Sequence, residues 1–351
     1  MHRKTLVTLS FFLLLPSLLL GCSNKKVEDP STNKTPLSKT EFFMGTAVSI
    51  SLYDNKDEAI IQKAFDRVKE IEDEISINKE KTDLDKINDA SGKEAVKAKD
   101  TTFEIVKKGL YYSNLASGTF DITIGPLVKL WSIGLPEQRL PSDKEINEKK
   151  ALVNYKDLEL NENNKTIFLK KPGMIIDLGG IAKGYTADEI AKILKENNVS
   201  SAIIDLGGNI YVIGKNSNTN NPWKIGIQDP LKPRGDIIGS ITAENKSIVT
   251  SGIYERYFEE NGKRYHHILS PASGYPYDNE IAGISILSDY SIDGDALSTT
   301  VFSKGLKEGL ELLETLPNVE GVFITKDKKV YLTKGIKSSL TITNKEYEIM
   351  N

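Results

Sequence analysis

A glycine-rich polar segment, residues 177–185, has residue types suited to binding an anion. It reads DLGGIAKGY and joins an expected strand to an expected helix. Glycines let a ligand approach the backbone closely, a helix N-terminus favours negative charge, and Lys183 adds a positive charge. A tight turn with a surface lysine is the alternative interpretation. Residues 118–127 form a second segment of this character, although its Phe120 is a residue type more often found in a core.

An acidic and a hydroxyl side chain stand at helical spacing in the C-terminal part of the sequence. Asp295 and Thr299 are four positions apart, which places them on one face of a helix. Both are hard oxygen ligands of the kind that Mg²⁺ accepts, with water, a backbone carbonyl or substrate phosphates completing the set. A simple helix-capping role for Asp295 is the competing explanation.

Two adjacent histidines are candidates for proton transfer near neutral pH. His266 and His267 follow one another in an expected strand, where neighbouring side chains point to opposite faces, so only one can enter a given site. A surface or hydrogen-bonded core histidine is the plain alternative. Composition also leaves open a serine hydrolase with Ser251 as its nucleophile, but the local G-x-S-x-G signature is absent.

Composition narrows the class of protein. The 351 residues carry 46 basic and 49 acidic side chains, a net charge of −3, which disfavours nucleic-acid binding. The single cysteine excludes an internal disulfide and any multi-cysteine zinc site, and three histidines leave little for a histidine-rich one. The sequence contains no G-x-G-x-x-G, no P-loop and no H-E-x-x-H motif.

The N-terminal residues predict export and lipid anchoring. A basic start precedes an apolar run, residues 6–20, that is too short for a comfortable membrane span, and the run ends in Gly21-Cys22. It resembles a bacterial lipoprotein signal, so we expect residues 1–21 to be removed and Cys22 to carry lipid. Residues 22–40 are polar and predict a flexible tether, which leaves residues 41–351 as the folded domain, outside the cytoplasmic membrane.

Hydrophobic periodicity predicts the elements that position these residues. Strands are expected over residues 42–53, 175–177 and 202–205, and a hairpin pairs 322–325 with 330–333. Helices are expected around 61–75, 187–194, 295–302 and 306–313. A further helix follows Thr101, which forms a capping box with Glu104. Helices and strands alternate without a regular βαβ series. The predicted fold is therefore α+β, with mixed or antiparallel sheets and packed helices.

Six segments, in order, resemble the FAD:protein FMN transferase (ApbE) family. They begin at residues 43, 118, 177, 206, 267 and 295 and read FMGT, GTFD, DLGGIAKG, LGGN, HILSP and DALST. The likeness runs from about Phe42 to beyond Phe302, essentially the whole folded region. It implies a single catalytic domain of the ApbE type, which is T-fold-like.

The resemblance also implies a reaction and a site. FAD is split at its pyrophosphate, FMN is attached by a phosphoester to Ser or Thr of a target protein, and AMP leaves, with Mg²⁺ neutralising the phosphates. The base for the acceptor hydroxyl is His267, which directly precedes Ile-x-x-Pro. The remaining positions that the family pattern implies are FAD contacts at Met44, Thr119, Phe120, Asp121, Asp177, Lys183 and Leu269, Ser251 in the same pocket, and metal ligands at Gly180 (carbonyl), Asp295 and Thr299.

The chain departs from the family pattern after the first helix, where residues 75–79 read ISINK and lack the aromatic that many members have. What covers the adenine on that side, near Asn78, is therefore open. The family's acceptor signature, D-x-x-[ST]-G-A-[ST]-like, is absent from this chain, so the expected partner is a separate extracytoplasmic flavoprotein. A Mg²⁺-dependent FAD pyrophosphatase, using water, and a non-catalytic FAD-binding lipoprotein remain as alternatives.

Overall fold

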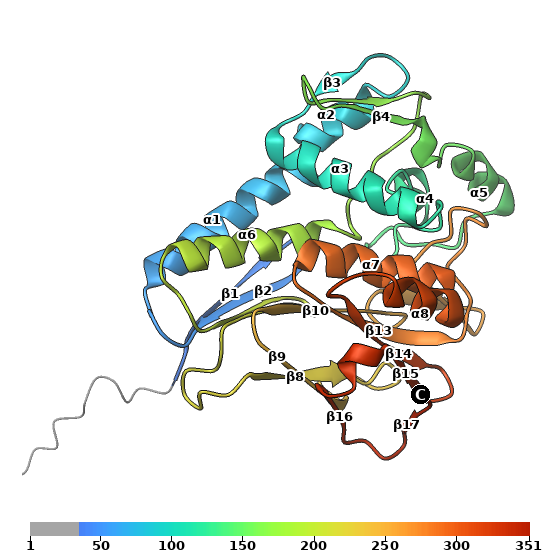
Figure 1. Cartoon of the computed structure of the whole chain (residues 1–351). Helices are drawn as coiled ribbons and strands as arrows, with labels where there is room; N and C mark the ends of the chain where they lie inside the picture. The colour runs from blue at the N-terminus through green and yellow to red at the C-terminus, as the bar shows by residue number, and fades with distance from the viewer. Residues whose placement is uncertain (1–34) are drawn as a thin grey trace, which may run out of the picture. The chain divides into compact units, whose positions relative to one another are not determined.

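The computed structural model describes residues 35–351, and its main element is a nine-stranded sheet (Figure 1). Its strands pair antiparallel except β15 with β17, which run parallel. In spatial order they are β1 (Leu37–Phe43), β2 (Thr46–Leu52), β6 (Ala202–Leu206), β7 (Asn209–Ile213), β10 (Lys246–Gly252), β13 (Ile281–Ser288), β14 (Glu320–Thr325), β15 (Lys329–Leu332) and β17 (Glu348–Ile349).

Helices cover one face of this sheet and a small sheet covers the other (Figure 1). Because both faces are covered, strands such as β13 are buried along their whole length and mostly apolar. The covering helices are α1 (Glu58–Ile75), α6 (Ala182–Glu196), α7 (Ser291–Lys304) and α8 (Leu306–Glu314). The opposite small sheet has the order β16 (Leu340–Ile342), β9 (Ile237–Ala243) and β8 (Trp223–Gln228).

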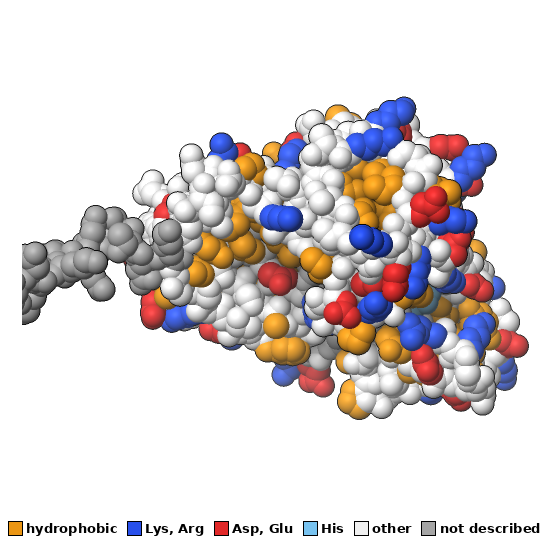
Figure 2. All heavy atoms as spheres, turned by 90° about the horizontal axis from the view of Figure 1, so that it is seen from below, with side chains coloured by type: hydrophobic (Ala, Val, Ile, Leu, Met, Phe, Trp, Pro, Cys, Tyr) orange, Lys and Arg blue, Asp and Glu red, His pale blue; other side chains and the backbone are white. Residues whose placement is uncertain are grey.

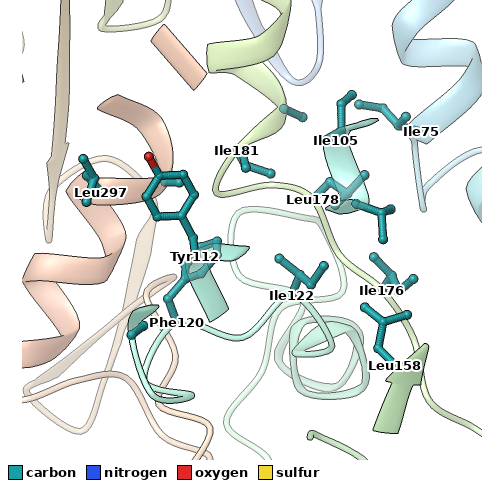
Figure 3. Close-up of a cluster of buried hydrophobic side chains, with 14 of the residues drawn as sticks. Ile75, Ile105, Tyr112, Phe120, Ile122, Leu158, Ile176, Leu178, Ile181 and Leu297 are labelled. Carbon is teal, nitrogen blue, oxygen red and sulfur yellow. The ribbon is translucent and has the colours of Figure 1, made fainter. Parts of the chain in front are cut away.

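A further group of elements lies beyond the helical layer, at the top of Figure 1. It holds α2 (Asp83–Asp89), β3 (Val96–Lys97), α3 (Asp100–Leu115), α4 (Gly125–Trp131), α5 (Asp143–Lys150), β4 (Leu158–Asn161) and β5 (Thr166–Leu169). A hydrophobic cluster joins this group to the helices below, with Tyr112, Phe120 and Ile122 lying near Leu178 and Leu297 (Figure 3). The remaining elements are the hairpin β11 (Tyr257–Glu260) and β12 (Lys263–His266) and two 3-10 turns, Tyr155–Asp157 and Lys334–Ile336.

The predicted α+β class with mixed and antiparallel sheets is confirmed. The predicted helices correspond to α1, α3, α6, α7 and α8, and the C-terminal hairpin is β14 with β15. Asp295 lies inside α7, four residues after its start, so the capping explanation of this side chain is wrong. In the described residues no helix is long and apolar enough to span a bilayer.

The first predicted strand, residues 42–53, is in fact two strands joined by a tight turn. β1 ends at Phe43 and β2 begins at Thr46, with Met44 and Gly45 at positive φ of 52° and 73° between them. The strand β1 already begins at Leu37, inside the range predicted as tether, because Leu37 packs on the cluster under β2 and α1. The predicted signal peptide, Cys22 and the tether up to residue 34 lie outside the described residues.

Two other local predictions are wrong for identifiable reasons. Residues 175–177 form no strand, only an isolated bridge between Ile175 and Ile124. The side-chain amide of Asn88 donates to the Ile176 carbonyl and accepts from the Ile176 N–H, so these groups cannot pair with a neighbouring strand. The capping box of Thr101 is absent, since α3 begins two residues earlier than predicted, with Lys99 as its N-cap. The Thr101 hydroxyl instead accepts a hydrogen bond from Arg67 on α1.

Candidate active site

One cavity of about 820 Å³ collects the FAD contacts, the metal ligands and the base that the family resemblance implied. Its walls come from the β1–β2 turn, the segment after α3, the start of α6, strand β10, the segment after β12, and α7. The predicted residues that line it are Met44, Thr119, Phe120, Asp121, Asp177, Gly180, Lys183, Ser251, His267, Leu269, Asp295 and Thr299. Segments far apart in the sequence therefore meet at one place.

Close packing of α6 against α7 positions the charged pair of the cavity. A Cβ on Gly184 would lie 2.3 Å from the Ser291 carbonyl oxygen, so only glycine allows this approach. The Asp295 carboxylate is buried; its Oδ2 accepts a hydrogen bond from the Gly184 N–H at 2.9 Å, and its Oδ1 lies 3.4 Å from Lys183 Nζ. The same contact thus fixes a carboxylate and an ammonium group side by side.

Gly180 and Thr299 lie close to each other in the same cavity as this pair. A Cβ built on Gly180 would stand 3.6 Å from Thr299 Oγ1, and Asp295 lies one turn before Thr299 on α7. This set of one carboxylate, one hydroxyl and one carbonyl suits Mg²⁺, which keeps several waters and takes substrate phosphates as ligands. Within residues 35–351 there is no group of three or more His, Cys, Asp or Glu that could hold a metal.

The hydrogen bonds of the two histidines distinguish their roles. His266 is buried; its Nε2 lies 2.8 Å from the Tyr277 carbonyl, and its Nδ1 accepts from the Ile268 N–H, so both nitrogens are used. His267 Nδ1 lies 3.2 Å from the Arg256 carbonyl. Because a carbonyl only accepts, we assign the proton of His267 to Nδ1, which leaves the Nε2 lone pair available.

Burial keeps both histidines neutral. Desolvation lowers the pKa of His266 to about 4, and desolvation with the nearby positive charge of Arg256 lowers the pKa of His267 to about 3. His267 lines the cavity, whereas His266 packs against Phe302. Of the two histidines, only His267 can therefore act as a base toward a molecule in the cavity.

The acidic residues of the cavity stand in contrasting surroundings. Burial raises the pKa of Asp177, against a hydrogen bond from the Gly179 N–H and the charge of Arg256. Desolvation by the surrounding cavity wall raises the pKa of Glu255 to about 7, although part of the side chain reaches the surface, and Lys183 and Arg256 oppose the rise. The cavity thus combines positive side chains with carboxylates that are costly to ionise, an arrangement that favours an anionic ligand.

Several predicted contact residues use their polar atoms within the protein. Asp121 accepts hydrogen bonds from the N–H and hydroxyl of Thr123 and from the Tyr155 N–H. Thr119 donates to the Ala116 carbonyl, so both residues shape the loop on which Phe120 sits. Ser251 Oγ lies 2.8 Å from Ser298 Oγ rather than beside a histidine, so these contacts give no support to a serine hydrolase.

Sequence reasoning missed some of the cavity wall. Glu72, Lys79, Glu255 and Arg256 line it, as does the segment 131–135 after α4. Glu255 and Arg256 directly follow the segment that holds Ser251, and their charge in an otherwise apolar stretch was a usable signal. Glu72 belongs to a helix with many charges, and nothing in its local pattern distinguishes it.

Comparison with known proteins decides the family. The family model described as "ApbE family" matches residues 44–323. The chain belongs to the ApbE family. The FAD:protein FMN transferase of Klebsiella pneumoniae (strain 342) is 35% identical over 314 residues, 90% of this chain and 97% of that protein. The FAD:protein FMN transferase of Treponema pallidum (strain Nichols) is 30% identical over 326 residues, 88% of this chain and 90% of that one.

Solved ApbE structures share the fold. The ApbE protein of Thermotoga maritima superposes with a TM-score of 0.79 at 31% identity, covering 87% of this chain and 99% of that one. The flavin transferase ApbE of Vibrio cholerae gives a TM-score of 0.78 at 26% identity, with the same two coverages. As a member of the ApbE family, the chain is an enzyme and a transferase.

Proposed function

We propose that this ApbE protein cleaves FAD at its pyrophosphate and transfers FMN to a Ser or Thr hydroxyl of another polypeptide. The observation that carries the proposal is the convergence of Lys183, Asp295 and the free Nε2 of His267 in one cavity. A phosphoryl transfer needs charge neutralisation at the phosphates and a base at the attacking hydroxyl. The relatives named FAD:protein FMN transferase supply the identity of the dinucleotide.

The roles of the residues follow from their positions. His267 Nε2 takes the proton of the acceptor hydroxyl as the hydroxyl oxygen bonds to the FMN phosphorus. The P–O bond that joins this phosphorus to AMP breaks, and AMP leaves. Lys183 binds the phosphate oxygens. Gly180, Asp295 and Thr299 would hold Mg²⁺, which would supply charge neutralisation for the pyrophosphate. Met44, Phe120 and Leu269 contact the dinucleotide.

A FAD pyrophosphatase and a non-catalytic FAD-binding protein would use the same cavity as a transferase, so the reaction products distinguish the three. The wild-type protein is incubated with FAD, Mg²⁺ and a peptide carrying the acceptor signature, and the peptide mass and released AMP are measured. A mass increase equal to FMN, absent from a peptide with Ala at the acceptor position, supports the transferase. AMP with free FMN and an unchanged peptide supports the pyrophosphatase, and intact FAD supports a binding protein.

We further propose that the enzyme acts outside the cytoplasmic membrane, anchored by lipid on Cys22, with an extracytoplasmic flavoprotein as its acceptor. Support comes from the basic start, the apolar run and the Gly21-Cys22 pair, together with the absence of an acceptor signature in this chain. Such an anchor leaves the cavity free to meet a partner at the membrane surface.

A further inference from the structure

Glu72, on the last turns of α1, bonds to two separate segments of the cavity wall. Its Oε1 accepts a hydrogen bond from the backbone N–H of Met44 at 2.6 Å, and its Oε2 lies 2.6 Å from Lys79 Nζ. The side chain is largely buried, with 18% of its surface exposed. Each oxygen thus accepts a hydrogen bond from a different segment, so the Glu72 carboxylate is anchored to both Met44 and Lys79.

The Met44 turn needs such support. Met44 and Gly45 both have positive φ, 52° and 73°, in a two-residue hairpin turn. Asn or Asp followed by Gly is the usual pair for this turn, because other side chains are strained in the left-handed region. The Met44 side chain lines the cavity, and its sulfur lies 3.5 Å from the Thr186 hydroxyl on α6. The residue is therefore held in a strained conformation at the place where a ligand binds.

The Lys79 contact ties a second segment to the same carboxylate. Residues 75–79, which leave the end of α1, line the cavity beside Met44 and Gly45. Lys79 Nζ also lies 2.8 Å from Asp73 on α1, so two carboxylates of the helix hold this exposed side chain. One carboxylate thus fixes the turn before α1 and the loop after it as a single wall.

We propose that Glu72 is a positioning residue that sets the affinity for the dinucleotide by holding Met44 and the 75–79 loop in their binding positions. This rests on the proposed function, because it takes FAD as the ligand of the cavity. Glu72 does not contact the donor set of Gly180, Asp295 and Thr299 through either oxygen. Its loss therefore affects binding and leaves the chemical step of the bound enzyme unchanged.

The test measures FAD binding directly, by flavin fluorescence, beside steady-state transfer. Glu72→Ala should weaken FAD binding about tenfold, the usual effect of losing a hydrogen bond to a charged group, with kcat at saturating FAD within about twofold of wild type. Glu72→Gln can still accept from Met44 and should recover part of the affinity. Glu70→Gln, on the exposed side of the same helix, is the matched control and should bind FAD normally.

A double-mutant cycle separates positioning from a general loss of stability. Glycine adopts the turn without strain, so in a Met44→Gly background Glu72→Ala should weaken FAD binding less than in wild type. Additive effects, or equal losses in Glu72→Ala and Glu70→Gln, would overturn the inference. If wild type binds FAD but transfers nothing, the proposed function fails; if it transfers normally and Glu72→Ala binds FAD as wild type does, this inference alone fails.

Discussion

The Asp295 carboxylate and the backbone N–H of Gly184 form a 2.9 Å hydrogen bond between two helices, α7 and α6. This bond leaves Oδ1 directed toward Lys183, 3.4 Å away. A buried carboxylate with one long cationic contact is incompletely neutralised, which suits a residue that receives a divalent cation. The predictions below begin from this arrangement.

Asp295→Asn should preserve the hydrogen bond to Gly184 and remove the charge that attracts Mg²⁺. We expect FMN transfer at limiting Mg²⁺ to fall by roughly 10²–10³-fold, with the melting temperature little changed. Asp293→Asn is the control, because Asp293 bonds to Tyr112 and Lys108 instead. Transfer by Asp295→Asn at the wild-type rate across a Mg²⁺ titration would contradict the metal assignment.

His267→Ala should slow the single-turnover transfer of FMN by roughly 10²–10⁴-fold, the usual effect of losing a positioned base. FAD affinity should change little, because Lys183 and Asp295 remain. His266→Gln, which can still donate to the Tyr277 carbonyl, is the control and should keep most of the rate. Similar losses of rate in both variants would show that the base is assigned to the wrong residue.

The buried His266 should make stability depend on pH. Its pKa is about 4 in the folded protein, against 6.5 for an ordinary histidine, so below about pH 6.5 the unfolded chain binds a proton that the folded protein does not. The free energy of unfolding should therefore fall as the pH is lowered from about 6.5 to about 4, by at most ~1.4 kcal/mol per pH unit for this group. Urea unfolding of wild type and His266→Gln at about pH 7.5 and about pH 5 measures this change in the free energy of unfolding. An equal change in both proteins would contradict the prediction.

Cys22→Ala should release the protein from the membrane without reducing its activity. Lipid attached at Cys22 is the expected anchor, and the residues that line the cavity all belong to the range 44–299 of the sequence. Detergent phase partition and labelling with radioactive palmitate compare the variant with wild type. Continued membrane association of Cys22→Ala would mean that something else holds the protein there.

Truncation should define where the fold begins. Removing residues 1–34 leaves β1 intact, and we expect wild-type stability and FAD binding. Removing residues 1–45 also deletes Leu37 and Phe43, which pack on the cluster beneath β2, and should lower the free energy of unfolding by roughly 2–5 kcal/mol. Chemical denaturation of both forms tests this, and equal stability would show that β1 contributes little.

Local sequence signals predicted much of this molecule because several elements carry their own pattern. The apolar spacing of α1 was sufficient to predict a helix, and the apolar runs of β14 and β15 were sufficient to predict a hairpin. Each of these elements buries apolar side chains in the core. Glycine-punctuated polar segments likewise revealed the site, because a ligand-binding backbone needs glycine where side chains would intrude. Gly184, beside the Ser291 carbonyl, is the clearest case.

The errors have a common cause, which is a tertiary partner that no local pattern encodes. The run at residues 175–177 is apolar like a strand, but Asn88 from a distant helix takes the hydrogen bonds of Ile176. The strand expected over 42–53 turns back at Met44, a residue whose type gives no turn signal, because Glu72 bonds to its N–H. The sequence did not indicate a role for Glu72, because its partner Met44 lies in a distant segment.

Gly184 and Asp295 are 111 positions apart in the chain, and the cavity exists only while both helices are docked. A ligand that touches Lys183 and Asp295 together therefore binds the folded state and not the unfolded one. Occupancy should raise the melting temperature with the logarithm of ligand concentration and slow hydrogen exchange in both helices at once. Cellular supply of the dinucleotide would then govern how long the enzyme survives proteolysis as well as how fast it works.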